Sequence, residues 1–368
     1  MLCLSVGCEQ SAEDMNDRKN TLSAISLFSG AGGMDLGFER AGFDVHWSND
    51  LDGTACETYQ INFNSENVIG PIENLAKSLK RFSEVDCVFG GPPCQGFSVA
   101  GKMDLEDPRS KLVYQFMDII SVLRPKSFVM ENVPSLATLN KFSKFREQLV
   151  QHAHALGYST DLQIFSSSEF GVPQDRRRMF FVGVLGKRDV DLRQRSRGYL
   201  KAAPSTREAI SDLGIQGSDQ NPCTCNAAVT IAASPVLRKS PYAGMLFNGA
   251  GRPIDPNRVA PTLPASMGGN RTPILDERLY YGDGFDWISM YHTHLIKGGD
   301  PYSKHAAPAS LRRLTIRESS RLHGFPDDFI FCGPKSAIYR QIGNSVPPTL
   351  AQAIAAILRD ILVSAVDA

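Results

Sequence analysis

Short apolar runs alternate with longer amphipathic stretches through the first half of the chain. The apolar runs are typical of buried strands, and each ends in glycine, proline or acidic residues that mark a turn. Strands that alternate with helices predict a parallel sheet with helices on both faces, so the expected fold class is α/β. We expect strands at 24–29, 44–50, 85–91, 127–133 and 179–185, and helices at 34–43, 54–63, 111–125 and 144–158.

The pattern changes after about residue 187. Residues 214–311 are rich in Pro, Gly, Ser and Asn, and they contain few helical periods. Within them, 252–274 is nearly all turn and loop by composition. Helical periods return at 315–325 and 345–366. The second half therefore predicts an irregular domain of short strands and loops, followed by helices.

The composition is that of an ordinary globular protein, with 368 residues of which 42% are hydrophobic and 21% charged. This length accommodates two domains, or one domain with a large insertion. No apolar stretch reaches about 18 residues, so we expect no membrane span. The eight cysteines form no Cys-x-x-Cys pair, and Cys223 and Cys225 have no nearby histidine. We therefore predict no metal site, and reduced thiols in a cytoplasmic protein.

Positive charge is concentrated in two segments, although the 39 basic and 39 acidic residues cancel over the whole chain. Residues 171–200 hold eight Lys and Arg against three Asp and Glu, and 307–325 hold four Arg against one Glu. Local positive charge of this kind favours a polyanionic partner such as nucleic acid. Either segment alone is also compatible with a solvated face.

The segment LFSGAGGMDLGF, residues 27–38, reads as a strand, a glycine turn and a helix. Such a turn lets backbone N–H groups and a helix N-terminus approach a ligand closely. Asn49 and Asp50 end the next strand about twenty residues later, a spacing typical of a carboxylate that binds ribose hydroxyls. The glycines do not match Gly-x-Gly-x-x-Gly, so a nucleotide-type ligand and a plain tight turn both remain open here.

The segment GGPPCQGFS, residues 90–98, holds Cys94 on a rigid loop directly after a predicted strand. A thiol nucleophile needs this kind of access and a lowered pKa. Glu131 ends the predicted strand at 127–133, and strand ends of one parallel sheet meet at the same edge. A carboxyl group there can act as an acid if burial raises its pKa. Taken singly, Cys94 also fits a buried inert thiol and Glu131 a surface acid.

The segment VPQDRRRMFFV, residues 172–182, leads three arginines into a strand. Arg176 and Arg178 then point to one face of the strand and Arg177 to the other. Two guanidinium groups beside a sheet-edge site suit recognition of phosphate or a carbonyl oxygen.

Six motifs occur together and in a fixed order, and this set resembles the DNA (cytosine-5)-methyltransferase family. They are LFSGAGGMDLGF, GGPPCQGFS, MENV, QDRRR, RRLTIRESSRLHGFP (312–326) and YRQIGNSVPP (339–348). The resemblance covers residues 25 to 355. It implies a Rossmann-like S-adenosylmethionine-dependent methyltransferase sheet with helices on both faces, plus a smaller, irregular, mostly β and loop target-recognition domain. The domains expected from it are a polar leader at 1–22, a catalytic and cofactor-binding domain at 23–190, a target-recognition domain at 191–335 and a C-terminal segment at 336–368 that returns to the catalytic domain.

The resemblance assigns the catalytic roles to four residues. Cys94 is expected to attack C6 of a cytosine, which makes C5 nucleophilic. Glu131 is expected to be protonated near N3 of the base. Arg178 matches the family arginine at the cytosine O2, and Arg176 is its partner in the site.

The same resemblance implies S-adenosyl-L-methionine as the cofactor, with Asp50 on its ribose. Two positions depart from the family pattern, because Pro71 stands where an acidic residue often contacts adenine and Asp50 stands where glutamate is commoner. Adenine recognition then rests on backbone groups or on Glu73. The cofactor-binding residues expected are Phe28, Ser29, Gly30, Ala31, Gly32, Gly33, Asp50, Leu51, Ile72, Pro93, Leu112, Asn344 and Ser345.

The variable region at roughly 190–311 occupies the place of the family's target-recognition domain. Its Thr262-Leu263 matches the threonine-leucine pair that the family keeps there. Phosphate contacts are expected from scattered basic side chains, and base contacts from loops in the major groove. The candidate DNA-binding residues are Gln95, Ser98, Arg252, Arg258, Thr262, Leu263, Asn270 and Arg271.

The implied activity is transfer of a methyl group to C5 of a flipped-out cytosine in a specific sequence of double-stranded DNA. A bacterial or phage modification enzyme is expected, a monomer that protects DNA from a cognate restriction endonuclease. A solitary regulatory methylase is the alternative to that role. The main alternative is a tRNA cytosine-5 methyltransferase on the same core. A DNA-binding protein with an inactive core and a nicotinamide oxidoreductase are the further alternatives.

Overall fold

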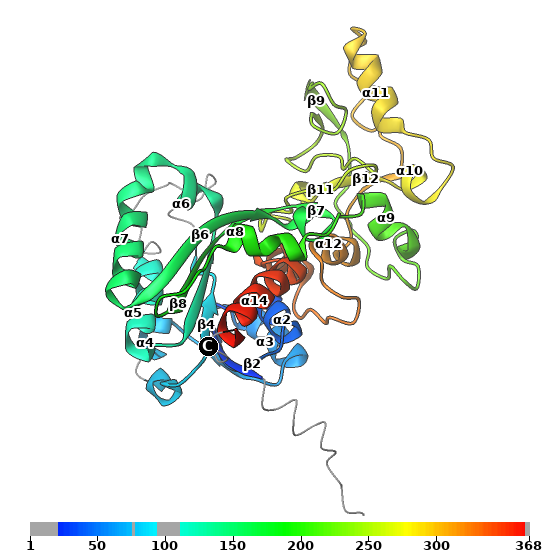
Figure 1. The fold of residues 1–368 in the computed structure, drawn as a ribbon. Helices are drawn as coiled ribbons and strands as arrows, with labels where there is room; N and C mark the ends of the chain where they lie inside the picture. Colours follow the sequence, from blue (N-terminus) through cyan, green and yellow to red (C-terminus); the bar gives the residue numbers. More distant parts are fainter. Residues whose placement is uncertain (1–20, 76–77, 94–110, 365–368) are drawn as a thin grey trace, which may run out of the picture.

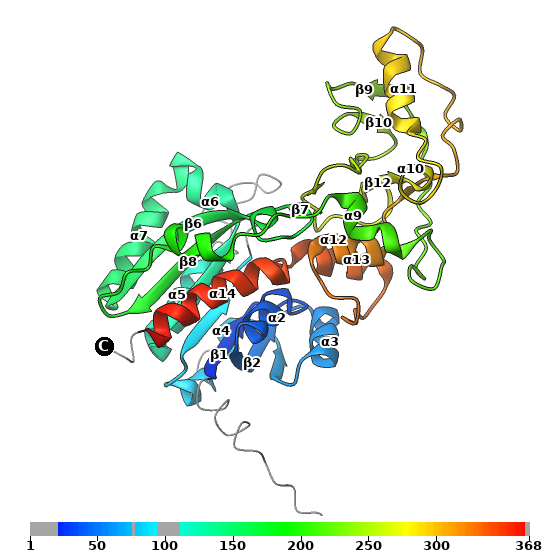
Figure 2. The same cartoon turned by 45° about the vertical axis from the view of Figure 1, so that its right-hand side comes forward.

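A large α/β domain and a smaller, irregular region make up the described part of the chain (Figure 1). The computed structural model describes residues 21–75, 78–93 and 111–364. The smaller region carries β9 to α11 and projects away from the large domain in both views (Figures 1 and 2).

A seven-stranded sheet forms the centre of the large domain, with the strand order β3-β2-β1-β4-β5-β8-β6. The first five strands in this order run parallel to one another. The strands are β1 (Leu22–Leu27), β2 (Phe43–Asp50), β3 (Glu66–Ile69), β4 (Cys87–Gly90), β5 (Ser127–Asn132), β6 (Tyr158–Ser166) and β8 (Arg177–Leu185).

Strand β8 requires a correction to the predicted parallel sheet. It lies between β5 and β6 and is antiparallel to both. Strand β6 was not predicted, because its polar residues do not form an apolar run. The reversal of β8 brings the start of this strand, and the arginines next to it, to the edge where the parallel strands end.

Helices cover both faces of the sheet, as predicted. On one face, α2 (Gly33–Arg40) and α14 (Pro348–Val363) pack on Phe43, Phe89 and Phe180. Gly37 permits close contact between these helices, because a Cβ there would lie 2.5 Å from the Ala351 Cβ. The other face is covered mainly by α5 (Lys111–Leu123) and α7 (Ser143–Ala155). The shorter or peripheral helices of this domain are α3 (Gly53–Asn62), α4 (Ile72–Leu75), α6 (Pro134–Thr138) and α8 (Leu192–Arg195).

The smaller region has short two-stranded sheets and two apolar clusters, in agreement with its irregular sequence. Strand β11 pairs in parallel with β7, which directly precedes β8, so this pairing attaches the region to the large domain. Its strands are β7 (Gln174–Asp175), β9 (Ile231–Val236), β10 (Met245–Phe247), β11 (Ala260–Pro261), β12 (Ile274–Asp276) and β13 (Leu311–Arg313). Its helices are α9 (Thr206–Ile210), α10 (Glu277–Tyr281), α11 (Trp287–Ile296), α12 (Ile316–His323) and α13 (Lys335–Asn344).

Helix α11 lies inside the segment in which few helical periods were expected. Asp286 caps it by accepting a hydrogen bond from the Ser289 N–H. Tyr291 and Leu295 are four residues apart and bury one face of the helix. The helix is short and is flanked by glycine-containing loops, so its helical periodicity was not apparent in the sequence.

The basic segment at 307–325 has a structural use that the sequence did not reveal. Arg312 is buried, and its guanidinium donates two hydrogen bonds to the Glu318 carboxylate, of 2.7 and 2.8 Å. Arg313 is also buried and donates to the carbonyl oxygens of Thr272 and Asn248. Arg321 forms ion pairs with Asp212 and Asp327. These three arginines are therefore committed to contacts within the protein, and they do not form a basic surface for a polyanion.

One helical stretch among the described residues, 335–363, is long and apolar enough to cross a membrane by length and composition alone. It comprises α13 and α14, and 61% of its most apolar window is buried inside the structure. The buried face of α14 belongs to the apolar core on the sheet.

Candidate active site

A cavity of about 590 Å³ lies at the edge where the five parallel strands end. Parallel strands of one sheet present their carboxyl ends, and the turns that follow them, at a common edge. Each of these five turns contributes to the cavity wall. The wall residues at these strand ends are 70–73 at β3, 49–52 at β2, 28–31 at β1, 90–93 at β4, and Glu131 and Val133 at β5.

The glycine turn after β1 has a shape that few other residues allow. Gly30 and Gly32 have φ values of 55° and 89°, in the left-handed region that favours glycine. A Cβ on Gly32 would lie 2.2 Å from the Phe63 ring. This close packing lets the turn curl against α3 and leaves its other side open to the cavity.

Asp50 ends β2 and faces the glycine turn. One carboxylate oxygen accepts a 2.8 Å hydrogen bond from the Gly30 N–H, and the other accepts one of 2.8 Å from the Asp52 N–H. Burial raises the pKa of this carboxyl group, although the two backbone donors oppose the shift. Each oxygen retains acceptor capacity for a second donor, such as a hydroxyl group.

Most of the residues predicted to bind the cofactor lie in the wall of this one cavity. They reach it from six separate segments of the sequence. The wall includes Phe28, Ser29, Gly30, Ala31, Gly33, Asp50, Leu51, Ile72, Pro93, Leu112, Asn344 and Ser345. Gly32 is not in the wall, since it packs behind the turn against Phe63.

The backbone carbonyl oxygens of the turn after β3 accept hydrogen bonds from other residues of the protein. The Asn49 side chain donates to the Gly70 carbonyl oxygen at 2.8 Å, and the Asn74 N–H donates to the Pro71 carbonyl oxygen at 3.1 Å. Pro71 has no N–H to offer. Glu73, two residues after Pro71, also lies in the wall and supplies a carboxylate at this end of the cavity.

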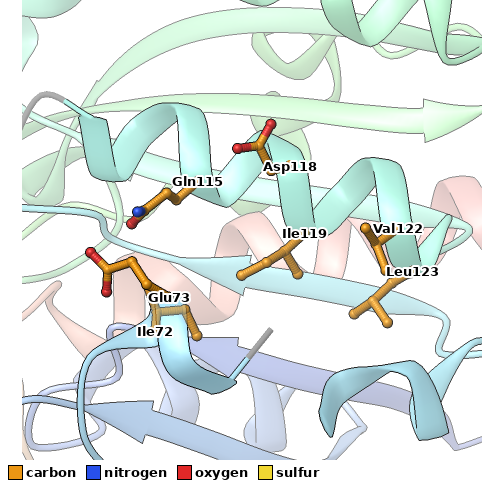
Figure 3. Close-up of a pocket in the computed structure, with 7 residues that line it drawn as sticks. All are labelled: Ile72, Glu73, Gln115, Asp118, Ile119, Val122 and Leu123. Carbon is orange, nitrogen blue, oxygen red and sulfur yellow. The ribbon is translucent and has the colours of Figure 1, made fainter. Parts of the chain in front are cut away.

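A second, smaller cavity of about 250 Å³ shares Ile72 and Glu73 with the first (Figure 3). It lies between α4 and α5. The Glu73 carboxylate and the Gln115 amide lie at one end of it, and apolar side chains of α5 line the other (Figure 3). The Gln115 Oε1 is buried and has no hydrogen-bond partner among the described residues.

Glu131 and Arg178 form an ion pair at the β5 end of the large cavity. The Arg178 Nε lies 2.7 Å from the Glu131 Oε1, and their side chains are 14% and 13% exposed. Burial raises the pKa of Glu131, whereas the guanidinium groups of Arg178 and Arg176 lower it, and burial is the larger effect. Gly91 allows this placement, because a Cβ there would lie 2.9 Å from the Glu131 Oε2.

Arg176 and Arg178 both line the cavity, while Arg177 between them is exposed, which agrees with the alternation expected for a strand. Their guanidinium groups have different partners. Arg176 is buried and donates to the carbonyl oxygens of Leu263, at 3.0 Å, and Gly343, at 2.7 Å. Its side chain thus holds the small region and the C-terminal segment against the large domain.

Asn132 is a positioning residue that sequence reasoning missed. Its buried side-chain amide donates to the Pro92 carbonyl oxygen at 3.1 Å and so fixes the proline loop relative to β5. The signal was present in the sequence, since Asn132 directly follows Glu131 at the strand end. Pro93 closes the described part of this loop; Cys94, Gln95 and Ser98 lie outside the described residues.

The predicted DNA-binding residues of the small region have different environments. Thr262 lines the cavity and its hydroxyl donates to the Asp175 carbonyl oxygen at 2.8 Å. The exposed members are Arg252, Arg258, Asn270 and Arg271. Leu263 requires a correction, because its side chain is fully buried in the core of the small region and has no surface to present to DNA.

Comparison with known proteins identifies the family of the chain. The family model described as C-5 cytosine-specific DNA methylase matches residues 22–359. The type II methyltransferase M1.HphI of Haemophilus parahaemolyticus is 34% identical over 91% of this chain and 86% of its own. M.MthTI of Methanothermobacter thermautotrophicus is 33% identical over 91% of this chain and 96% of its own. A tRNA methyltransferase is therefore not the favoured reading.

Solved structures show the same fold. A DNA modification methyltransferase encoded within an E. coli prophage is 27% identical, with a TM-score of 0.66 over 93% of this chain and 100% of its own. The Dnmt2 methyltransferase of S. pombe has a TM-score of 0.64 over 94% of this chain and 99% of its own at 19% identity, a likeness of fold alone. The match along nearly the whole sequence shows that the chain belongs to the C-5 cytosine-specific DNA methylase family and is a DNA (cytosine-5)-methyltransferase.

Proposed function

We propose that this enzyme transfers a methyl group from S-adenosyl-L-methionine to C5 of a cytosine in a specific duplex sequence, through a covalent bond between Cys94 and C6. One observation carries the proposal. A single cavity runs along the sheet edge from Glu73 to the Glu131–Arg178 pair, and the loop that leads to Cys94 departs from its wall at Pro93. The described residues thus combine a long ligand cavity with an acid and a guanidinium group at one end, and Pro93 in its wall directly precedes Cys94 in the sequence.

The residues of the cavity fit the cofactor. The glycine turn has no room for a Cβ at Gly32 and leaves its cavity side open, and Asp50 offers acceptors to ribose hydroxyls. The order of the turns along the edge also sets a direction. If Asp50 holds the ribose, Ile72 and Glu73 after β3 would hold the adenine, and the residues at the ends of β4 and β5 would face the methyl group. When bound, the cofactor supplies an electrophilic methyl group on a sulfonium sulfur.

Cys94 is proposed as the nucleophile. Cytosine C5 is a poor nucleophile while the ring is aromatic, and bond formation between the Cys94 Sγ and C6 removes that obstacle. C5 then takes the methyl group as the bond between that group and the sulfonium sulfur breaks, and the leaving group is the neutral thioether. A base, such as water, accepts the C5 proton, and the electron pair of the C5–H bond restores the C5–C6 double bond as the Sγ departs as a thiolate.

Glu131 and Arg178 are proposed to hold the cytosine ring. Burial raises the pKa of Glu131, which favours the protonated carboxyl group that would share its proton with N3 as charge develops on the ring. The Arg178 guanidinium is suited to the O2 oxygen. Arg176 contributes by position, since its hydrogen bonds fix the segments around the site.

A cytosine inside a duplex cannot reach this edge, so the base is proposed to flip out of the helix. The target-recognition domain is proposed to span 191–335, between a catalytic domain at 23–190 and a C-terminal segment at 336–368. Packing departs from this division near both boundaries, since Leu192 packs with α14 and Tyr339 packs in the core of the small region. Arg252, Arg258, Asn270 and Arg271 are its proposed DNA contacts, and Gln95 and Ser98 those of the loop.

The biological role proposed is protection of DNA from a cognate restriction endonuclease, in the cytoplasm and as a monomer. The support is the naming of the relatives as type II methyltransferases.

Expression in a host without cytosine methylases, followed by sequencing of 5-methylcytosine in its genomic DNA, tests this function. We expect one short sequence to be methylated at C5 throughout the genome, and Cys94→Ala to abolish the mark. Modification of tRNA with unmodified DNA would contradict the proposal.

A further inference from the structure

A buried histidine at the end of α12 joins two segments that line the active-site cavity. His323 is fully buried. Its Nε2 lies 3.0 Å from the Ser345 carbonyl oxygen, and its Nδ1 lies 3.1 Å from the Gln174 side-chain nitrogen. Ser345 belongs to the cavity wall, and Gln174 lies on β7, two residues before Arg176.

The hydrogen bonds fix the protonation of this ring. The Gln174 Oε1 accepts a 3.0 Å hydrogen bond from the Leu263 N–H, so the amide nitrogen of Gln174 must face His323. That nitrogen is a donor, and the His323 Nδ1 is therefore the acceptor. The proton then resides on Nε2 and is donated to Ser345. Burial and the nearby Arg176 guanidinium hold the pKa of His323 well below its usual range, so the ring is neutral.

These hydrogen bonds form a continuous hydrogen-bond chain from the small region to the part of the cavity wall that contains Ser345. It runs from Leu263 through the Gln174 amide and the His323 ring to Ser345. Thr262, next to Leu263, lines the same cavity from the side of the small region. The Leu263, Gln174 and His323 side chains are buried, and Ser345 is half-buried in the cavity wall.

We propose that His323 and Gln174 are positioning residues that couple target-DNA binding to cofactor binding. The inference rests on the proposed function, because it takes S-adenosyl-L-methionine as the ligand beside Ser345. DNA that fixes the 262–265 segment also fixes Ser345 through this chain, and the cofactor then binds a wall that is already ordered. Linkage requires the reverse effect to be equal, so cofactor strengthens DNA binding by the same factor.

The test measures the dissociation constant of S-adenosyl-L-homocysteine, which cannot donate a methyl group. It is measured with and without an unmethylated duplex that contains the target sequence of the enzyme. The ratio of the two constants is the coupling. We expect DNA to tighten binding by about 5-fold or more in the wild-type enzyme, the lower end of usual couplings.

Two substitutions interrupt the chain at different bonds. In His323→Gln the amide nitrogen can replace Nε2 and donate to Ser345, but the acceptor for Gln174 is lost. In His323→Asn the amide oxygen can replace Nδ1 and accept from Gln174, but the donor to Ser345 is lost. Both variants are expected to lower the ratio to near one, because the loss of either hydrogen bond disconnects Leu263 from Ser345, and DNA binding then no longer orders the cofactor site. Gln174→Met removes the hydrogen bonds of the Gln174 amide to Leu263 and His323, and it is also expected to lower the ratio to near one.

Tyr339→Phe is the matched control. It removes a buried 2.6 Å hydrogen bond to the Leu314 carbonyl oxygen in the core of the small region, away from the chain. Its melting temperature is expected to fall while the ratio stays at the wild-type value.

A wild-type ratio of one, or a ratio retained in the folded His323 and Gln174 variants, would overturn the coupling. Failure of wild-type protein to bind S-adenosyl-L-homocysteine at all would instead contradict the proposed function.

Discussion

The Arg178 Nε lies 2.7 Å from the Glu131 Oε1 although the two residues come from strands of opposite direction. Glu131 stands near the end of β5, and Arg178 stands near the start of β8. Because β8 is antiparallel, its start meets the carboxyl edge of the parallel strands. The reversal of one strand therefore brings the acid and the guanidinium to the same place in the cavity.

Glu131→Gln is expected to lower kcat by about 100-fold, the lower end of what a positioned acid contributes. Wild-type kcat should fall as pH rises through the raised pKa of Glu131, since the protonated form is the one that acts. The amide does not titrate, so this alkaline decline should disappear in the variant. Measurement of kcat against pH checks this, and an unchanged alkaline decline in the variant would assign it to another group.

Gly91→Ala is expected to displace the Glu131 carboxylate, because the new Cβ would lie 2.9 Å from its Oε2. A misplacement of about 1 Å at a reacting group can reduce the rate by about 100-fold. Gly198→Ala is the matched control, since a Cβ there meets no atom within 4 Å. Equal kcat values for the two variants would show that the approach of residue 91 to Glu131 is unimportant.

Asp35→Asn is expected to change how stability depends on pH. Asp35 is fully buried, and burial raises its pKa to about 7. The folded protein thus keeps a proton that the unfolded chain releases near pH 4, so folding is penalised as pH rises from about 4 to about 7. The amide avoids this penalty and retains the oxygen that accepts from the Tyr59 hydroxyl.

Urea unfolding at pH 5 and pH 8 measures the effect. The free energy of unfolding of Asp35→Asn, relative to wild type, should be greater at pH 8 by on the order of 2 kcal/mol. A relative stability that is the same at both pH values would mean that Asp35 is ionised in the folded protein.

Glu73→Gln is expected to weaken selection for the adenine amino group. The Gly70 and Pro71 carbonyl oxygens each already accept a hydrogen bond within the protein, whereas the Glu73 carboxylate has more acceptor sites and a charge, which makes it the stronger acceptor. Replacement of the charged acceptor by a neutral amide oxygen should reduce the preference for S-adenosyl-L-homocysteine over its inosine counterpart by about 10-fold.

Asp118→Asn removes the same charge from the smaller cavity without touching the cofactor wall, and it should keep the preference. If Glu73→Gln retained the full preference as well, the adenine would be selected by other groups.

The sequence predicted the parts of the fold that depend on local pattern. Apolar runs located β1, β2, β4, β5 and β8 to within a few residues, and strand-end placement brought Asp50 and Glu131 to one edge. The direction of β8 was not predictable from its pattern, because a buried strand has the same apolar run whether it is parallel or antiparallel. Residue order alone also does not reveal that Arg176 bonds to Leu263 and Gly343, 87 and 167 residues away.

Charge was the least reliable guide in the sequence. Arg312 and Arg313 contributed to a basic segment that suggested a polyanion, yet both are buried and bonded within the protein. A count of charges cannot distinguish an arginine on a surface from one that pairs with a distant acid or carbonyl. Leu263 is a similar case, since it adjoins a residue of the cavity wall but packs in a core.

The central claim is that the Cys94 sulfur bonds to the cytosine ring, and covalent trapping tests it most directly. A duplex that carries 5-fluorocytosine at the methylated position has no C5 proton to lose, so the adduct cannot resolve after methyl transfer. With cofactor present, we predict a protein–DNA product stable to denaturation, whose crosslinked peptide maps to Cys94 by mass spectrometry. An enzyme that methylates the ordinary duplex but yields no such product, or one crosslinked at another residue, would contradict the account.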